Sequence, residues 1–333
     1  MRLSTGFAME KKRYLQLGDI ASELGVSIST VSRAISGKGN ISRKTRDRVR
    51  AYIEQFGYQP NAAAQQLAGG RTGNIGVVLP SDAFTRLNDF FQTTLLGICQ
   101  EAAANNYDVV ITTVNNDDIS YLKRLLSRRS VDGIILMRSL SDDPSMQYLC
   151  EQEADFVVIG SVDREGILQV DIPHKEACRE LTLRMLEHSK HKVGIIIGDT
   201  NYIVNQNRLK GFLSAVKEMK LNKSEYKIYT DITEEQEQKA AMEELISVGT
   251  DTLLCGDDHI CMIALDMIDS FCPNPKSLKV ASFYNNALLK MRGITAINVD
   301  DASLGAAAVV KLISKIEDRE VPSGITPGYR LYY

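Results

Sequence analysis

The feature that most constrains the fold is a regular alternation, from Asn74 to the C-terminus, of short apolar runs with amphipathic stretches. The apolar runs are predicted to be strands, at 75–79, 108–114, 133–137, 156–159, 193–197, 227–229, 252–255 and 280–283, and the C-terminal segment 328–333 is also predicted to be a strand. Helical spacing of apolar residues separates them, near 87–105, 117–128, 205–219, 233–248 and 258–270. Continuous apolar strands that alternate with helices are typical of parallel sheets covered on both faces.

This part of the chain holds more strands than one sheet accommodates comfortably, since about ten are expected. Two doubly wound α/β subdomains are the simplest division, with a first crossing near 171–173. We expect the body to comprise residues 73–333. Its first subdomain is predicted to be formed by 73–172 and 298–323, and its second by 173–297 and 324–333.

Residues 1–59 have a different pattern, with no strand-like apolar run. Helices are predicted at 19–24, ended by Gly25, at 28–36, capped by Ser27, and after Ser42. Residues expected in their common core are Ile20, Ala21, Leu24, Val26, Val31, Ile35, Val49, Tyr52, Ile53 and Phe56. Two short helices joined by a Gly-containing turn, with a third across them, indicate an all-α helix-turn-helix head.

Charge separates the two parts of the chain. The whole sequence has 39 Lys and Arg against 42 Asp and Glu, a net charge of −3. Residues 1–72 carry 12 basic and 5 acidic residues, a net of +7, which leaves −10 for the rest. A basic block on an acidic body favours a polyanionic partner for the first part, and a solvated helical surface is the alternative.

Targeting signals are not evident in the sequence. No apolar run approaches the ~18 residues needed to cross a bilayer, and the N-terminus lacks the apolar stretch of a secretory signal. We therefore expect a cytoplasmic protein with no membrane partner.

Several spaced motifs in the head resemble the lactose/galactose repressor (LacI/GalR) family. The first is Gly18-Asp-Ile-Ala-Ser-Glu-Leu-Gly-Val-Ser-Ile-Ser-Thr-Val-Ser-Arg33. It is followed by Ile41-Ser-Arg-Lys-Thr-Arg46, Phe56-Gly-Tyr-Gln-Pro-Asn61, Ala64-Gln-Gln-Leu-Ala-Gly69 and Ile75-Gly76. The body also resembles the family's effector domain, whose fold is similar to periplasmic sugar-binding proteins. The resemblance therefore covers almost the whole chain.

The resemblance implies a DNA-reading surface at the start of the second helix, which would lie in the major groove. Ile28, Ser29 and Thr30, after Ser27, correspond to positions that read bases. Arg33, one turn later, could contact a guanine or a phosphate. The alternative role of the serines and the threonine is capping of the helix. Some of the basic residues of the third helix are expected at phosphates, and the others in solvent.

Residues 60–72 correspond to the family's hinge. Asn61 is a good helix cap, and the stretch after it has helical propensity but is too short for a stable isolated helix. We expect it to become ordered on DNA. The resemblance implies that Leu67 wedges a base step in the minor groove, with Asn61 and Ala68 beside it. An ordinary contact between Leu67 and the body is the alternative.

The resemblance also implies a small-molecule site between the two subdomains. Arg208 belongs to Asn205-Gln-Asn-Arg-Leu-Lys-Gly211, which matches an Arg-x-x-Gly motif whose arginine contacts the effector; a surface salt bridge is the alternative. Phe90 and Phe91 occupy a position that stacks on ligands in relatives, although core packing would also explain them. Asp82, after the first strand, is a further candidate.

Two turns depart from the family pattern. The usual Gly-Phe-Asp-Asp turn is Ser282-Phe-Tyr-Asn285 here, which replaces an expected ligand carboxylate by Tyr284. The usual Asn-Asp pair is Gly256-Asp257. Tyr284 could stack on a sugar face, and Asp257 or Asp258 could accept hydrogen bonds from hydroxyls.

Two further short runs favour a subgroup of the family. Asn88-Asp-Phe-Phe91 and Asn298-Val-Asp300 resemble Gram-positive maltose-type regulators. Maltose or a malto-oligosaccharide is therefore the expected effector.

These observations predict a sequence-specific DNA-binding transcriptional repressor of carbohydrate-utilisation genes, controlled by a small sugar. It is expected to bind pseudo-palindromic operator DNA as a homodimer, and not as a tetramer. No cofactor, metal or enzymatic activity is expected. The alternatives are a sugar receptor with no DNA role and a carbohydrate enzyme, for which Asp257-Asp258-His259 with Cys255 and Cys261 is the candidate cluster.

Overall fold

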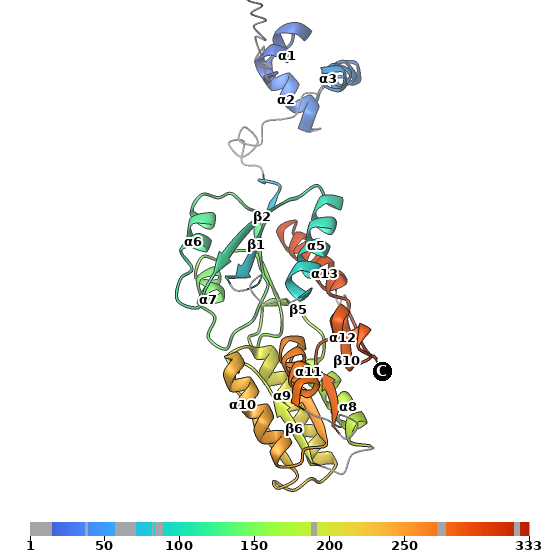
Figure 1. The fold of residues 1–333 in the computed structure, drawn as a ribbon. Coiled ribbons are helices and arrows are strands. Elements are labelled where there is room, and N and C mark those ends of the chain that lie inside the picture. The colour runs from blue at the N-terminus through green and yellow to red at the C-terminus, as the bar shows by residue number, and fades with distance from the viewer. Residues whose placement is uncertain are drawn as a thin grey trace, which may run out of the picture. The chain divides into compact units, whose positions relative to one another are not determined.

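The computed structural model describes residues 15–36, 39–56, 71–81, 83, 89–187, 192–271, 278–322 and 327–332. The chain divides into two compact units, residues 1–72 and residues 73–333, which are treated separately below. The first unit contains α1 (Leu17–Leu24), α2 (Ile28–Ser36) and α3 (Arg43–Phe56) (Figure 1). Within the described ranges, no helix has both the length and the apolar character needed to cross a membrane.

The helix boundaries of the first unit follow from local chemistry. Gly25 ends α1 in the left-handed conformation, at φ 64°. Ser27 caps α2, because its Oγ accepts the Thr30 backbone N–H at 3.1 Å. Ser42 caps α3 in the same way, accepting from the Thr45 N–H at 3.2 Å. The predicted three-helix unit is therefore confirmed.

The core of this unit is small and apolar. Its buried members are Ile20, Ala21, Val31, Ala34 and Val49. Along α3 the cluster extends only as far as Ile53, and Phe56 is 51 % exposed. The prediction that Phe56 belongs to the core was wrong. Its ring packs instead on Tyr52 of the same helix, with 4.5 Å between ring centroids.

The second unit begins with a parallel five-stranded sheet in the order β2-β1-β3-β4-β5. Its strands are β1 (Asn74–Pro80), β2 (Asp108–Val114), β3 (Gly133–Leu136), β4 (Phe156–Ile159) and β5 (Leu168–Val170). Helices α5 (Asp89–Ala104) and α13 (Asp301–Ile316) cover one face, and α6 (Ser120–Ser127) and α7 (Pro144–Glu151) cover the other (Figure 1). Apolar strands buried on both faces account for the continuous apolar runs.

A second sheet of six strands follows, in the order β11-β10-β9-β8-β6-β7. Its strands are β6 (Val193–Ile196), β7 (Tyr226–Tyr229), β8 (Thr252–Cys255), β9 (Lys279–Ser282), β10 (Thr295–Val299) and β11 (Tyr329–Tyr332). Among the described strand pairs of this second sheet, only β10–β11 is antiparallel. Helices α8 (His174–Leu186) and α9 (Ile203–Glu218) pack on one face, and α10 (Glu235–Ser247), α11 (Asp258–Phe271) and α12 (Ala287–Met291) on the other.

The predicted fold class, a helical head followed by two α/β subdomains, is confirmed. Two strands, β5 and β10, were not predicted, because a polar residue, Gln169 or Asn298, interrupts the apolar run of each. The return to the first sheet also differs from the expected position at residue 298. Val299 still pairs with Tyr329 in the second sheet, so the crossing follows it.

Helices α5 and α13 approach each other through two glycines. A Cβ atom on Gly305 would lie 2.2 Å from the Thr94 carbonyl oxygen, and one on Gly97 would lie 2.0 Å from the Ala302 carbonyl oxygen. No other residue fits at either position without displacing backbone. This close contact fixes the first turn of α13, where the chain has just returned from the second sheet.

Candidate functional site

The start of α2 gathers the residues that were predicted to read DNA. The Ser27 Oγ lies 2.8 Å from both the Ser29 Oγ and the Thr30 Oγ1, so the three hydroxyls form one cluster. Ile28 is 55 % exposed, and Arg33 lies exposed one turn later. Ser27 does act as the cap, which confirms the alternative role for that residue. The hydroxyls of exposed Ser27 and Ser29 and of half-buried Thr30 nevertheless lie beside the exposed Ile28 side chain at the N-terminus of α2.

The basic residues of α3 do not all face solvent. The Arg48 Nη2 donates to the Leu24 carbonyl at 3.2 Å, at the C-terminal end of α1, where a cation is favoured by the helix dipole. The Arg46 Nε is buried. Arg43, Lys44 and Arg50 are exposed. Of the other predicted residues, Asn61, Leu67 and Ala68 of the hinge, and Asp82 of the effector site, lie outside the described residues.

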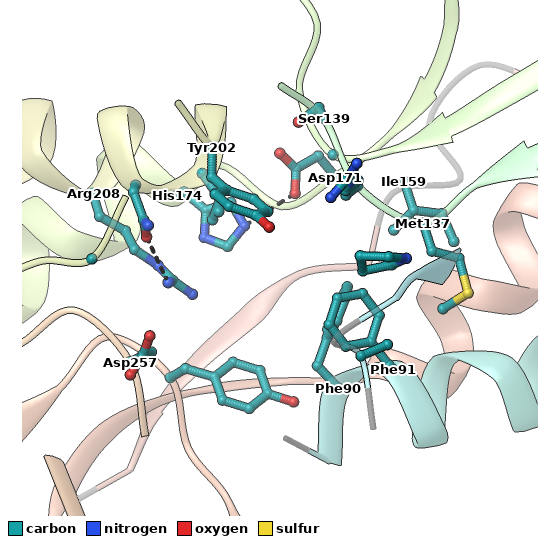
Figure 2. A pocket seen from close by; sticks show the side chains of 18 of the residues that line it. Phe90, Phe91, Met137, Ser139, Ile159, Asp171, His174, Tyr202, Arg208 and Asp257 are labelled. Atoms are coloured by element: carbon teal, nitrogen blue, oxygen red, sulfur yellow. Dashed lines mark hydrogen bonds and ion pairs between the residues drawn. The ribbon is translucent and has the colours of Figure 1, made fainter. Parts of the chain in front are cut away.

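A cavity of about 360 Å³ lies between the two sheets of the second unit. Its walls come from the residues that follow β1, β3, β4 and β5 on one side and β6, β8, β9 and β10 on the other. The carboxyl ends of both parallel sheets therefore face it, which is where α/β folds bind ligands. Figure 2 shows Phe90 and Phe91 on one side and Arg208 and Asp257 on the other.

The two subdomains touch along one edge of this cavity. Leu140 and Tyr202 form an isolated antiparallel bridge between them. The Ser141 N–H donates to the Asn201 carbonyl at 3.0 Å, and the Gln206 Nε2 donates to the Ser141 Oγ at 2.7 Å. This contact joins the two subdomains next to Ser139 and Tyr202, which line the cavity.

All five described residues of the predicted effector set line the cavity: Phe90, Phe91, Arg208, Asp257 and Tyr284. Phe90 and Phe91 lie in the first turn of α5, with their rings edge to face at 5.2 Å. Both rings also pack against the core of the first subdomain, so Phe90 and Phe91 line the cavity and belong to the core packing at the same time. Phe90 further contacts the ring of Tyr284 edge to face, at 6.3 Å.

The arginine and the glycine of the Arg-x-x-Gly motif in α9 have different surroundings. A Cβ atom on Gly211 would lie 2.4 Å from the Lys175 carbonyl oxygen, so the glycine lets α9 approach α8. Arg208 faces the cavity and is 8 % exposed, which excludes the surface salt bridge considered for it. Its Nη1 lies 3.2 Å from the Asn205 Oδ1, and its Nε has no hydrogen-bond partner among the described residues.

Sequence reasoning missed a pair formed by Tyr284 and Asp301. The Tyr284 hydroxyl donates to the Asp301 Oδ2 at 2.5 Å. Burial, together with the nearby carboxylates Asp300, Asp258 and Asp89, raises the pKa of Asp301 to about 7, despite the hydrogen bond from Tyr284, which lowers it. Burial and Asp301 also raise the pKa of Tyr284.

Asp258 is a second buried carboxylate of the cavity wall, 1 % exposed. Its Oδ2 accepts a hydrogen bond from the Asn286 Nδ2 at 2.9 Å. Burial and the charge of Asp257 raise the pKa of Asp258 to about 6, despite the hydrogen bond from Asn286 and the charge of Arg208. Asp257 itself caps α11, because its Oδ1 accepts the Ile260 N–H at 2.9 Å.

The crossing between the subdomains contributes a second missed pair, Asp171 and His174. The His174 Nε2 lies 3.1 Å from the Asp171 Oδ1, and the Ser161 Oγ donates to the Asp171 Oδ2 at 2.5 Å (Figure 2 draws the first contact). Burial would raise the pKa of Asp171, but the charge of His174 and these hydrogen bonds lower it overall. Arg138, buried after β3, also lines the cavity.

Two members of the cluster considered for an enzyme are cysteines, and the structure describes both. Cys255 and Cys261 are both fully buried. Burial and the neighbouring Cys261 raise the pKa of Cys255 well above its ordinary value, which keeps it a thiol rather than a nucleophilic thiolate.

Comparison with known proteins finds relatives for both parts of the chain. The family model "Bacterial regulatory proteins, lacI family" matches residues 16–61, and "Periplasmic binding proteins and sugar binding domain of LacI family" matches residues 72–323. The HTH-type transcriptional regulator MalR of Streptococcus pneumoniae is 33% identical over 215 residues, which are 63% of this chain and 65% of that protein. The match thus spans less than two thirds of either chain.

Two other similarities extend over nearly the whole chain. Catabolite control protein A of Staphylococcus xylosus is 27% identical over 325 residues, 95% of this chain and 97% of that protein. The structure of the Lac repressor dimer bound to operator and the anti-inducer ONPF superposes with a TM-score of 0.78 at 21% identity, covering 96% of this chain and 98% of that chain. The chain belongs to the lacI family of bacterial regulatory proteins.

Proposed function

We propose that the protein is a sequence-specific DNA-binding transcriptional repressor of carbohydrate-utilisation genes, controlled by a sugar. The observation that carries this proposal is that one chain joins a basic helix-turn-helix unit to an α/β body whose cavity is lined by both aromatic and charged side chains. The names of the relatives, a MalR transcriptional regulator and a catabolite control protein, support it.

For the head, we propose that α2 lies in the major groove. Ile28, Ser29 and Thr30 would contact base edges, and Arg33 a guanine or a phosphate. Their exposure at the start of the helix supports this assignment. In the hinge, Leu67 would wedge a base step, flanked by Asn61 and Ala68. A pseudo-palindromic operator would be bound by a homodimer, which aligns two heads with two half-sites.

For the body, we propose that a sugar binds the cavity in contact with Phe90, Phe91, Arg208, Asp257 and Tyr284. The volume of about 360 Å³ falls in the usual range for small-molecule sites. Aromatic rings and charged groups on facing walls suit a ligand with both C–H faces and hydroxyls. Maltose or a malto-oligosaccharide is our proposed effector, supported by the similarity to a MalR regulator. No cofactor or catalytic step is required for this role, which we place in the cytoplasm.

Sugar and operator are then coupled through the body. A sugar that favours one relation of the two subdomains shifts DNA affinity, and DNA shifts sugar affinity by the same factor. Such couplings usually amount to about 1–3 kcal/mol.

The test is operator selection by the full chain. Duplexes are selected from a randomised pool, and binding is measured by fluorescence anisotropy at several salt concentrations, with and without maltose. We expect a pseudo-palindromic consensus, affinity that falls steeply as salt rises because counterions are released, and a change in affinity with maltose. Failure to retain any duplex at low salt would refute the DNA role and leave a sugar receptor.

A further inference from the structure

Asp301 lies in the cavity wall, and only one of its two carboxylate oxygens has a hydrogen-bond partner among the described residues. It follows β10, begins α13 and is 8 % exposed. Its Oδ2 accepts the Tyr284 hydroxyl at 2.5 Å, while its buried Oδ1 has no hydrogen-bond partner among the described residues. Leaving a buried carboxylate oxygen without a donor is costly. A ligand in the cavity that donates a hydrogen bond would remove this cost.

The charge around Asp301 is negative. The charged groups that act on it are three carboxylates, Asp89 at the start of α5, Asp258 at the start of α11, and the neighbouring Asp300. Around the described cavity as a whole, the aspartates outnumber the arginines: they are Asp171, Asp199, Asp257, Asp258 and Asp301 against Arg138 and Arg208. A ligand phosphate or carboxylate placed at Asp301 would therefore meet like charge at low dielectric. A hydroxyl adds no charge.

Arg138 and Arg208 have buried N–H groups that need a hydrogen-bond acceptor. The Arg138 Nη2 and the Arg208 Nε are buried donors with no partner in the described part of the chain, and they come from opposite subdomains. A hydroxyl both donates and accepts, so one polyhydroxyl ligand can serve Asp301 and both arginines. An ammonium group could serve only the carboxylate, because it has no acceptor.

We propose that Asp301 is the principal acceptor for the hydroxyl groups of the effector, and that it selects an unphosphorylated sugar over a sugar phosphate. Tyr284 is a positioning residue in this arrangement, since its hydroxyl fixes the Asp301 carboxylate and its ring is held against Phe90. This inference rests on the proposed function, because it takes the cavity to be a sugar site.

The experiment compares the full-length wild-type chain with Asp301→Asn, Tyr284→Phe and Asp300→Asn. Asp300→Asn is the matched control: Asp300 is the neighbouring aspartate, is exposed, and caps α13 through Ser303 rather than lining the cavity. Thermal shift followed by titration calorimetry is run with maltose, cellobiose, glucose 6-phosphate, maltose 6′-phosphate and glucosamine. Binding of the selected operator duplex shows that each variant is folded.

We expect a neutral sugar to stabilise the wild type and the sugar phosphates to leave it unchanged. Asp301→Asn should weaken that sugar roughly 10- to 100-fold, the loss expected for a hydrogen bond to a charged group. Tyr284→Phe should weaken it less, and Asp300→Asn by less than about twofold.

Three results would overturn the proposal: equal sugar affinity in Asp301→Asn and the wild type, stabilisation of the wild type by a sugar phosphate, or preference for glucosamine over neutral sugars. If no sugar of any class binds while the operator does, the sugar site fails and Asp301 loses this role, but the DNA function stands. Loss of operator binding by the wild type would instead refute the proposed function.

Discussion

Replacing Asp301 by Asn should change how the stability of the body depends on pH. The pKa of Asp301 is about 7 in the folded protein, against an ordinary value of 3.8, because the carboxyl is buried beside Asp300, Asp258 and Asp89. The unfolded chain therefore releases this proton at a lower pH than the folded one. Stability is fully present below the unfolded pKa and is lost as pH rises toward the folded pKa.

The size of the effect follows from the shift. Each pKa unit corresponds to about 1.4 kcal/mol, so ionisation of Asp301 lowers the free energy of unfolding by on the order of 4 kcal/mol well above pH 7. Part of this loss has already occurred at pH 5. Between pH 5 and pH 8 the free energy of unfolding falls by a further amount of about 2.5 kcal/mol. Asn cannot ionise, so the variant should gain about that much relative to the wild type over this interval.

Urea unfolding at several pH values measures the difference. The chain has no Trp and 13 Tyr, so near-ultraviolet circular dichroism of tyrosine can follow the body. The control is Asp300→Asn, where the sign is reversed. Hydrogen bonds from the side chain and backbone of Ser303 lower the pKa of Asp300, so its contribution is present at neutral pH and lost as pH falls. Parallel stability curves for Asp301→Asn and the wild type between pH 5 and pH 8 would refute the reasoning.

Three other substitutions test the fold and the sites. Gly305→Ala should lower the free energy of unfolding by about 1–3 kcal/mol in urea titrations, because the new methyl group meets backbone of α5, whereas Gly328→Ala, with open space around it, should not. Arg208→Ala should weaken sugar binding at least about tenfold by calorimetry, since the guanidinium is buried in the cavity wall; unchanged affinity would remove it from the site. Ser27→Ala should destabilise the head by about 1 kcal/mol through loss of the α2 cap, measured by amide hydrogen exchange, while the exposed mid-helix Ser32→Ala should not.

Much of the architecture could be predicted because it is encoded locally. Gly25 and Ser27 mark helix boundaries through their own backbone and side-chain chemistry, and they do so in the structure. The apolar runs predicted most of the strands because parallel strands are buried on both faces. The prediction for Phe56 was wrong because the spacing of apolar residues shows which side of a helix is apolar, but not which of those residues contact the other helices.

The effector residues that were found came from motif correspondence rather than from physical pattern. Arg208 was placed by its Arg-x-x-Gly motif, and the packing of the motif is visible only in the structure, where Gly211 lies against α8 and Arg208 lines the cavity. Asp301 matched no such motif. Its partner Tyr284 lies 17 residues away, across β10, and local spacing cannot report that contact.

The failure to predict β5 and β10 and the failure to predict the Tyr284–Asp301 and Asp171–His174 pairs have the same cause. In an α/β body, the residues that follow each strand at its carboxyl end are the candidates for the ligand site. Asp171 directly follows β5, and Asp301 follows β10 after one residue. Because neither segment was identified as a strand, neither aspartate was identified as the end of one. An interrupted apolar run such as 295–299 is weak evidence for a strand on its own, but in the structure this segment pairs with β9 and β11 and leads into α13, which packs on the first sheet. Topology therefore points to Asp301 at a position where residue pattern alone does not.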